Sequence, residues 1–318
     1  MPETIGVPLA IVLLVVGLAM LVVGADALVR GAAALARRIW ISEFVVGVTV
    51  VAFGTSAPEL FASGGAVLQG QTEIAIGNVV GSNIANILLI LGAGAVMMPI
   101  AMHRSVRRVE IPIMAGITLA AWVMLLDEQV TRFEGLLLVL GLVVYIYSVV
   151  LRGKIDVTEE LPEITGTAMR DALLLIGGMI GLAIGARALV LGAVAVAEKA
   201  GVPSGIIGAT VIAFGTSLPE LAATARAATA RKSDIAVGNI IGSNVFNLLC
   251  VMGICALIKP LSMPGAMTIH LHTMGAVTLA LVVYALIRGL IGRVTGVIFL
   301  TGYLAYVGYL VYTILAAG

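Results

Sequence analysis

Two glutamates, Glu59 and Glu220, lie in the middle of long apolar stretches of the sequence. A carboxylate within the hydrocarbon core of a membrane is costly, so such a residue marks a functional path by default. A proline precedes each of them, Pro58 and Pro219. Inside a helix, proline frees the carbonyl four residues earlier from its usual hydrogen bond and kinks the chain. Both features favour a site that offers oxygen atoms to a ligand.

Hydroxyl and amide side chains accompany the glutamates at helical spacing. Thr55 and Thr216 lie four residues before them, so each hydroxyl shares a helical face with a carboxylate. The predicted metal-binding set has three further kinds of member. They are the serine next to each threonine, a serine and an asparagine four residues apart in the following apolar stretch, and the backbone carbonyl one turn before each threonine. These further members are Ser56, Ser217, Ser82, Asn86, Ser243, Asn247, Ala52 and Ala213.

The chemistry of this set indicates the ligand class. Carboxylate, hydroxyl, amide and carbonyl oxygens suit hard cations such as Ca²⁺, which takes six to eight oxygens at about 2.3–2.6 Å, and Na⁺. Mg²⁺ fits less well, because it holds its waters. Neither Cys nor His enters the set, which argues against zinc, copper or nickel. The histidines fall at the ends of apolar stretches and the two cysteines inside one, so we expect interfacial and core roles for His103, His270, His272, Cys250 and Cys255.

The apolar stretches contain other polar residues, namely four asparagines with two possible roles and an aspartate beside an arginine. Four asparagines near the glutamates either orient ligands or satisfy backbone groups where helices are broken; they are Asn78, Asn83, Asn239 and Asn244. Asp26 has Arg30 four residues later, the spacing of a local ion pair. We expect this local pair rather than a bridge from Asp26 to Arg187.

The elements that hold these residues are membrane-spanning helices. The 318 residues are 61% hydrophobic and 11% charged, with a mean hydropathy of +1.16, which excludes a soluble enzyme on a single anchor. The net charge of +1 gives no basic excess for nucleic acid. Ten apolar runs are each long enough to cross the membrane: 8–29, 41–68, 73–99, 109–126, 132–151, 169–197, 203–228, 234–258, 268–287 and 294–316.

The positive charges predict the orientation. If every run crosses once, fourteen of the eighteen Lys and Arg residues fall on one side. That side is cytoplasmic by the positive-inside rule, which places both termini outside. We therefore expect a multi-pass protein of the cell or inner membrane with extracytoplasmic termini.

An internal repeat divides the chain. Residues 24–100 and 185–261 align without a gap at a constant offset of 161, including GTSAPEL against GTSLPEL and IAIGNVVGSNIAN against IAVGNIIGSNVFN. A polar linker, 152–168, separates a first five-helix repeat, 1–151, from a second, 169–318. Because five is odd, the second copy must enter the membrane upside down. The predicted fold is thus an all-α polytopic membrane protein with ten transmembrane helices in two inverted repeats, an architecture typical of alternating-access transporters.

The two motifs, GTSxPEL and GNxxGSNxxN, occurring twice, resemble the α-repeats of the cation/calcium antiporter superfamily, specifically its sodium/calcium exchanger branch. The resemblance implies Ca²⁺ binding by Glu59 and Glu220 with Thr55 and Thr216. It further implies that spans 1 and 6 slide as a unit across a bundle containing spans 2, 3, 7 and 8. The implied contributors to Na⁺ sites are Ser56, Ser82, Ser217, Ser243 and the carbonyls of Ala52 and Ala213.

One position departs from the family. Well-known exchangers of this branch end the second motif in aspartate, where this chain has Asn247, so the site carries a formal charge of −2 rather than −3. The hydroxyls of the GTS segments favour Na⁺ coupling, with Ca²⁺/H⁺ antiport through the same glutamates as the alternative. A cation channel and an intramembrane enzyme fit less well. We expect no catalytic residue and no cofactor, a monomer, and the bilayer with Ca²⁺ and Na⁺ as the only partners.

Overall fold

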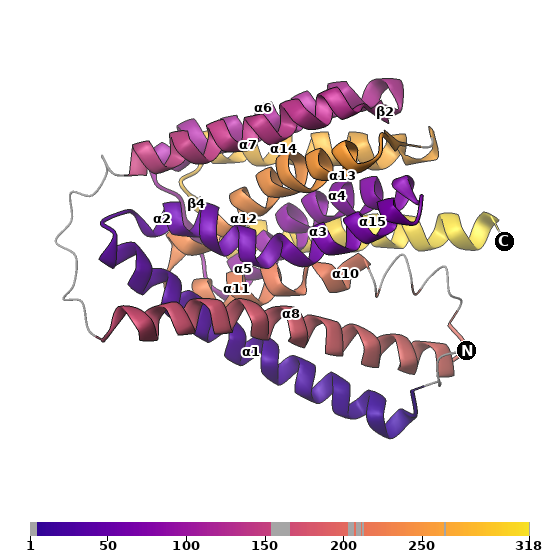
Figure 1. Cartoon of the computed structure of the whole chain (residues 1–318), viewed down its shortest axis with the longest axis horizontal. Helices are drawn as coiled ribbons and strands as arrows, with labels where there is room; N and C mark the ends of the chain where they lie inside the picture. Colours follow the sequence, from indigo (N-terminus) through magenta and orange to yellow (C-terminus); the bar gives the residue numbers. More distant parts are fainter. Residues whose placement is uncertain are drawn as a thin grey trace.

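The protein is a bundle of long apolar helices (Figure 1). The computed structural model describes residues 5–153, 166–202, 207, 211, 213–263 and 265–317. Within these ranges nine helices are long and apolar enough to cross a membrane. The ends of these nine helices agree with the predicted runs to within a few residues, apart from α1, which continues nine residues further. The all-α, polytopic class predicted from the sequence is confirmed.

The first half of the chain supplies five of these helices. They are α1 (Val7–Arg38); α2 (Glu43–Val46), η1 (Gly47–Val51) and α3 (Ala52–Leu68) in one rod; α4 (Thr72–Ala85), η2 (Asn86–Leu91) and α5 (Gly92–Met97) in a second; η3 (Val106–Glu110), α6 (Ile111–Met124) and η4 (Leu125–Asp127) in a third; and α7 (Arg132–Gly153). Three of the rods contain a π-helical turn, η1, η2 and η3, a feature frequent near functional sites.

The second half supplies the other four. They are α8 (Ala168–Lys199); α12 (Ser233–Phe246), the π turn η6 (Asn247–Val251) and α13 (Met252–Ile258) in one rod; α14 (Thr268–Ile287), which follows η7 (Gly265–Met267); and α15 (Arg293–Ala317). The run expected at 203–228 lies partly outside the described residues. Its described part forms α10 (Ala213–Thr216) and α11 (Leu218–Thr229), which are separated at Ser217.

Two short strand pairs join the halves, which the sequence did not predict. β1 (Ile100–Ala101) pairs with β4 (Leu290–Ile291), and β2 (Gln129–Val130) pairs with β3 (Leu261–Ser262), both antiparallel. In the first pair Ile100 faces Ile291, and in the second Val130 faces Leu261. Because Leu261 and Ile291 lie 161 residues after Ile100 and Val130, the two pairs have equivalent registers.

The helices α4 and α12 occupy the centre of the bundle. Every residue of α12 from Ile235 to Phe246 is buried, as expected for a helix that is apolar or small on all sides. A Cβ atom on Gly242 of α12 would lie 2.5 Å from the carbonyl oxygen of Val48, so glycine is required for this close approach to η1. The outer helices, such as α15, carry many exposed apolar side chains that are suited to contact lipid.

The long helices α1 and α8 pack along each other in opposite directions at one side of the bundle (Figure 1). A Cβ atom on Gly24 would lie 2.9 Å from the nitrogen of Leu182, and one on Gly178 would lie 2.5 Å from the nitrogen of Leu28. Small residues allow such close backbone contact between helices in lipid. The contact glycines recur every seventh residue in both helices: Gly17, Gly24, Gly31, Gly178, Gly185 and Gly192.

Gly178→Ala should therefore separate α1 from α8. We expect the free energy of unfolding to fall by about 1–3 kcal/mol, since the added methyl group meets backbone atoms that cannot move aside. The measurement is the thermal unfolding midpoint of the purified protein. The control is Gly116→Ala in α6, where the added Cβ meets no atom within 4 Å. Equal midpoints for the two variants would contradict the packing argument.

Candidate ion-binding site

The two glutamates lie together at the centre of the bundle. Glu59 of α3 and Glu220 of α11 are each 1% exposed, and their carboxylates are close enough to interact electrostatically. The central helices α4 and α12 pack beside them and bring in the second motif of each half. Within the part of the chain that the structure describes, neither carboxylate has a basic partner, so a bound cation or a proton is needed to relieve their mutual repulsion.

The hydroxyls of each half lie beside the carboxylate of the other half. Ser56 Oγ donates a hydrogen bond to Glu220 Oε1 at 3.0 Å, and Thr55 also contacts this carboxylate. In the equivalent way Thr216 and Ser217 contact the carboxylate of Glu59. The sequence placed each threonine on the same face as the glutamate of its own half, whereas the structure gives it the opposite glutamate. The site is thus built jointly by the two halves.

Two asparagines link α4 and α12 to the glutamate helices. Asn78 Nδ2 donates to Ser63 Oγ at 2.9 Å and to the carbonyl of Glu59 at 3.4 Å. Its Oδ1 accepts a hydrogen bond from Thr216 Oγ1 at 3.3 Å. Asn78 therefore links α3, the helix that carries Glu59, to the hydroxyl of Thr216 in the second half.

Asn239 makes the equivalent contacts. It donates to Thr224 Oγ1 at 3.0 Å and to the carbonyl of Glu220 at 3.4 Å, and it accepts from Thr55 Oγ1 at 3.1 Å. The other two asparagines behave differently, because Asn83 and Asn244 donate to carbonyls four residues earlier in their own helices. The four asparagines thus form two pairs: Asn78 and Asn239 link helices at the site, whereas Asn83 and Asn244 bond backbone carbonyls of their own helices.

Several buried polar atoms of the site have no hydrogen-bond partner among the described residues. A buried polar atom without a partner costs about 1–3 kcal/mol, so such atoms rarely cluster unless they serve a function. The Oε2 atom of each glutamate is unpaired, while Oε1 of Glu220 accepts the hydrogen bond from Ser56. The unpaired atoms are Glu59 Oε2, Glu220 Oε2, Ser243 Oγ, Asn83 Oδ1, Asn86 Nδ2, and both amide atoms of Asn247.

Direct contacts connect eight of the twelve residues of the predicted set, namely Glu59, Glu220, Thr55, Thr216, Ser56, Ser217, Ser82 and Ala52. Ser82 accepts a hydrogen bond from Ser217 at 3.4 Å, and the carbonyl of Ala52 accepts one from Thr55 at 3.3 Å. Asn86, Ser243 and Asn247 are buried in the adjacent parts of α4, η2, α12 and η6. The side chain of the twelfth, Ala213, lies outside the described residues, although its backbone belongs to α10.

Sequence reasoning did not include Asn78 and Asn239 in the predicted set. Both follow their glutamate by 19 residues, and each is the first polar residue within its GNxxGSN motif. That repeated position was the available signal. Their buried partners, Ser63 and Thr224, were also missed.

Asn239→Ala should weaken the site more than Asn244→Ala. The first change removes three hydrogen bonds between helices, two donated by Asn239 to Thr224 and to the carbonyl of Glu220 and one accepted from Thr55, and a buried group left without a partner costs about 1–3 kcal/mol. The second removes only a contact within one helix. We expect a lower unfolding midpoint and weaker Ca²⁺ binding for Asn239→Ala, measured by thermal unfolding and calorimetry. An equal effect of the two changes would show that the link between the halves is unimportant.

The polar residues outside the site have structural contacts. Asp26 pairs with Arg30 at 2.9 Å, as predicted, and also with Arg226 of α11 at 2.7 Å, which was not predicted. Arg187 is exposed on α8.

The cysteines lie in the core, as predicted, and the histidines contact nearby side chains. His270 packs on Tyr306, His272 accepts a hydrogen bond from Trp122 at 3.2 Å, and His103 lies 3.3 Å from Asp234. Cys250 and Cys255 are buried in the core as free thiols. These residues belong to helix packing rather than to the oxygen-lined site.

The donor set defines the ion chemistry. Within the part of the chain that the structure describes, no group of three His, Cys, Asp or Glu side chains could hold a metal ion. The site instead combines two carboxylates with neutral oxygens from hydroxyl, amide and carbonyl groups. Such a set suits Ca²⁺ or Na⁺, which bind oxygen in flexible geometry, better than Zn²⁺ or Cu²⁺.

Known proteins share this sequence and fold. The profile of a family described as "Sodium/calcium exchanger protein" matches residues 9–151 and 171–312. The putative antiporter CaxA of Alkalimonas amylolytica is 40% identical over 287 residues, covering 86% of this chain and 89% of the relative. The sodium/calcium exchanger MaX1 of Methanosarcina acetivorans is 31% identical, covering 87% of this chain and 91% of the relative.

Solved structures agree with these relatives. The sodium-calcium exchanger NCX_Mj, in a crystal soaked with 10 mM Na⁺ and 10 mM Sr²⁺, superposes with a TM-score of 0.85 at 31% identity. The match covers 95% of this chain and 99% of that one. Together with the profile match over both halves, this shows that the chain is a multi-pass membrane transporter rather than an enzyme, and that it belongs to the prokaryotic branch of the sodium/calcium exchanger family.

Proposed function

We propose that this protein is a secondary antiporter that exchanges Ca²⁺ for Na⁺ across the membrane by alternating access. The observation that carries the proposal is the pair of buried glutamates, each with one unpaired oxygen, within a cluster of hydroxyl and amide oxygens. The sequence relatives and the solved structure named as sodium/calcium exchangers support the same pair of ions.

Charge balance explains why the two ions exclude each other. The site carries two carboxylates, so one Ca²⁺ or two Na⁺ neutralise it. One Ca²⁺ and two Na⁺ bound at the same time would leave a net positive charge in a low-dielectric interior, where charge interactions are several times stronger than in water. Competition for the same oxygens converts a Na⁺ gradient into Ca²⁺ movement.

The ions bind where two inverted five-helix repeats meet. The repeats are residues 1–151 and 169–318, and the linker 152–168 joins them. Residues 154–165 of this linker lie outside the described residues. Support comes from contacts that recur at the 161-residue offset. Asn78 and Asn239 make equivalent hydrogen bonds, and both strand pairs have equivalent registers. Two halves of opposite orientation can exchange conformations, which gives inward-open and outward-open states of similar energy.

The moving part in this scheme is the pair α1 and α8, which slides across the central helices. Their close glycine packing favours movement as one unit. The Asp26–Arg226 ion pair ties α1 to α11. Arg187 of α8, which is equivalent to Asp26 at the 161-residue offset, makes no ion pair within the described ranges.

The Ca²⁺/H⁺ alternative uses the same glutamates without their hydroxyl partners. Thr55, Ser56, Thr216 and Ser217 all lie against a carboxylate, where they add neutral ligands that a proton does not need. A cation channel is disfavoured because one chain supplies the complete site, which also leads us to expect a monomer.

The protein should be oriented with its arginine-rich loops in the cytoplasm and both termini outside. Ser105→Cys and Ala316→Cys place single reactive thiols at exposed positions near the two membrane surfaces, while Cys250 and Cys255 stay buried. In intact cells an impermeant maleimide should label only Ala316→Cys. Labelling of both positions, or of Ser105→Cys alone, would overturn the orientation.

Calorimetry of the purified protein tests the proposed ion pair. Ca²⁺ should bind in choline chloride, and added Na⁺ should weaken its apparent affinity in a saturable, competitive way. Replacing Na⁺ by K⁺ at equal ionic strength controls for screening. An affinity that depends on pH but not on Na⁺ would favour the Ca²⁺/H⁺ alternative instead.

A further inference from the structure

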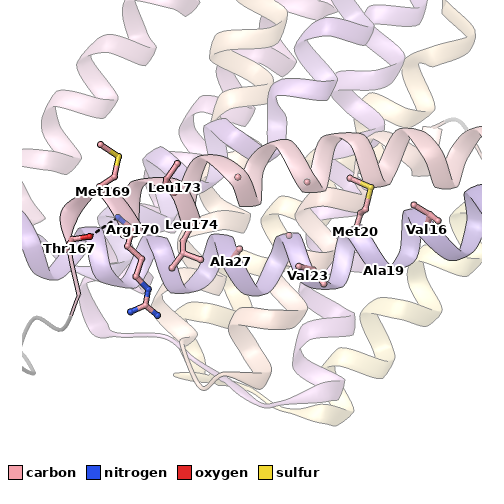
Figure 2. A pocket seen from close by; sticks show the side chains of 13 residues that line it. Val16, Ala19, Met20, Val23, Ala27, Thr167, Met169, Arg170, Leu173 and Leu174 are labelled. Atoms are coloured by element: carbon pink, nitrogen blue, oxygen red, sulfur yellow. Dashed lines mark hydrogen bonds between the residues drawn. The ribbon is translucent and has the colours of Figure 1, made fainter.

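A groove of about 820 Å³ runs along the outer surface between α1 and α8, on the side away from the ion site. Figure 2 shows apolar side chains of both helices along it, including Val16 and Val23 of α1 and Leu173 of α8. All three are well exposed, at 46%, 68% and 64%. The groove is therefore open to the lipid, and its volume falls within the range of about 300–1,000 Å³ that is typical of ligand sites.

Glycines hollow the groove. Gly24, Gly177 and Gly181 contribute to its lining, and a Cβ atom on Gly177 would meet nothing within 4 Å. Gly178, by contrast, is in backbone contact with α1. The contact glycines thus hold the helices together, while Gly177 leaves space on the outer side that an apolar chain can fill.

The end of the groove at which α8 begins is basic. Arg170 lines it, is exposed, and makes no ion pair with any residue that the structure describes. The neighbouring carboxylate of Asp171 is already bound by Arg38 at 2.7 Å. The start of α8 adds the partial positive charge of a 32-residue helix.

A second arginine points to the same end. Arg30 lies seven residues after Val23 and fourteen after Val16, which places it on the groove face of α1. Its side chain is 63% exposed, and it shares the carboxylate of Asp26 with Arg226. Two guanidinium groups on one carboxylate leave an excess positive charge at this part of α1.

We propose that this groove binds an anionic phospholipid, with an acyl chain along α1 and α8 and the phosphate at Arg170. The apolar groove fits the chain, and the basic end complements the negative headgroup. Arginine binds phosphate through two parallel charge-assisted hydrogen bonds, which makes it suited to this position. Because α1 and α8 pack against each other along the same groove, the bound lipid stabilises their contact.

The test measures thermal stabilisation of the purified, full-length protein in detergent as lipid is added. Dioleoyl phosphatidylglycerol should raise the unfolding midpoint in a saturable way, whereas dioleoyl phosphatidylcholine and inorganic phosphate should not. Because the unfolding midpoint does not depend on ion transport, a negative result would count against the lipid site and not against the proposed Na⁺/Ca²⁺ exchange.

Two variants locate the effect. Arg170→Gln should weaken the apparent affinity for phosphatidylglycerol about tenfold, and Arg170→Lys should restore most of it. Gly177→Leu should fill the groove and abolish stabilisation by the lipid. Gly116→Leu in α6, also an exposed glycine with open space around it, is the matched control and should respond like the parent.

Three outcomes would overturn the proposal. Phosphatidylcholine or inorganic phosphate could stabilise the parent as strongly as phosphatidylglycerol, which would remove the requirement for an anionic lipid. Arg170→Gln and Gly177→Leu could both keep the full response, which would place the lipid elsewhere. Gly116→Leu could lose the response as completely as Gly177→Leu, which would show that the effect is not specific to the groove.

Discussion

Glu59→Gln and Glu220→Gln should each lower Ca²⁺ transport by at least about a hundredfold while the protein stays folded. Either change leaves a divalent ion facing one negative charge in a buried site, where a charge pair is worth several times its value in water. The loss of a few kcal/mol of binding free energy corresponds to a hundredfold or more in affinity. The measurement is ⁴⁵Ca²⁺ uptake into proteoliposomes under an outward Na⁺ gradient.

The matched control is Glu73→Gln. Glu73 lies in the first turn of α4, in a neighbouring spanning segment, but it is exposed. This variant should transport like the parent, and all three should elute from a sizing column as the same species. Parental transport by either Glu59→Gln or Glu220→Gln, once correct insertion is established, would remove the two glutamates from the site.

Asn247→Asp should change the coupling of the exchanger. Neither atom of the Asn247 amide has a partner among the described residues, so a carboxylate there displaces no hydrogen bond. The parent site, at −2, is neutralised by two Na⁺, and a third would leave an uncompensated charge of +1. A third carboxylate beside Ser243 should therefore tighten Na⁺ binding or raise the number of Na⁺ bound together.

Voltage reports this change. Exchange of three Na⁺ for one Ca²⁺ moves one net charge, worth about 2.3 kcal/mol per 100 mV, whereas two for one moves none. The reversal potential of Ca²⁺ flux at fixed gradients should differ between parent and Asn247→Asp. Gln71→Glu adds a carboxylate at an exposed position and should leave the reversal potential unchanged. Identical Na⁺ and voltage dependence of parent and Asn247→Asp would show that Asn247 does not set coupling.

The sequence predicted the helices well because each span is a run of about 20 apolar residues with a clear end. The nine described spans lie where hydropathy placed them. The strand pairs were missed because two residues at a connection, such as Ile100 and Ala101, have no periodicity to detect. Their pairing depends on how distant loops meet in space.

The same limit applies to the site. Repeated motifs identified Glu59, Glu220 and their hydroxyl neighbours, since polar residues in apolar helices are conspicuous. Which hydroxyl meets which carboxylate depends on how the halves pack, so the contact of Ser56 with Glu220, 164 residues away, had no local signal. The pair of Asp26 and Arg226, 200 residues apart, was missed for the same reason.

Uptake of ⁴⁵Ca²⁺ into proteoliposomes under opposing gradients is the most direct test of Na⁺/Ca²⁺ antiport. Vesicles loaded with Na⁺ and diluted into Na⁺-free buffer should accumulate Ca²⁺, and collapsing the Na⁺ gradient with an ionophore should abolish the uptake. Vesicles with a pH gradient and no Na⁺ should accumulate no more than protein-free vesicles. Uptake driven by the pH gradient alone, with no response to Na⁺, would contradict the proposed function.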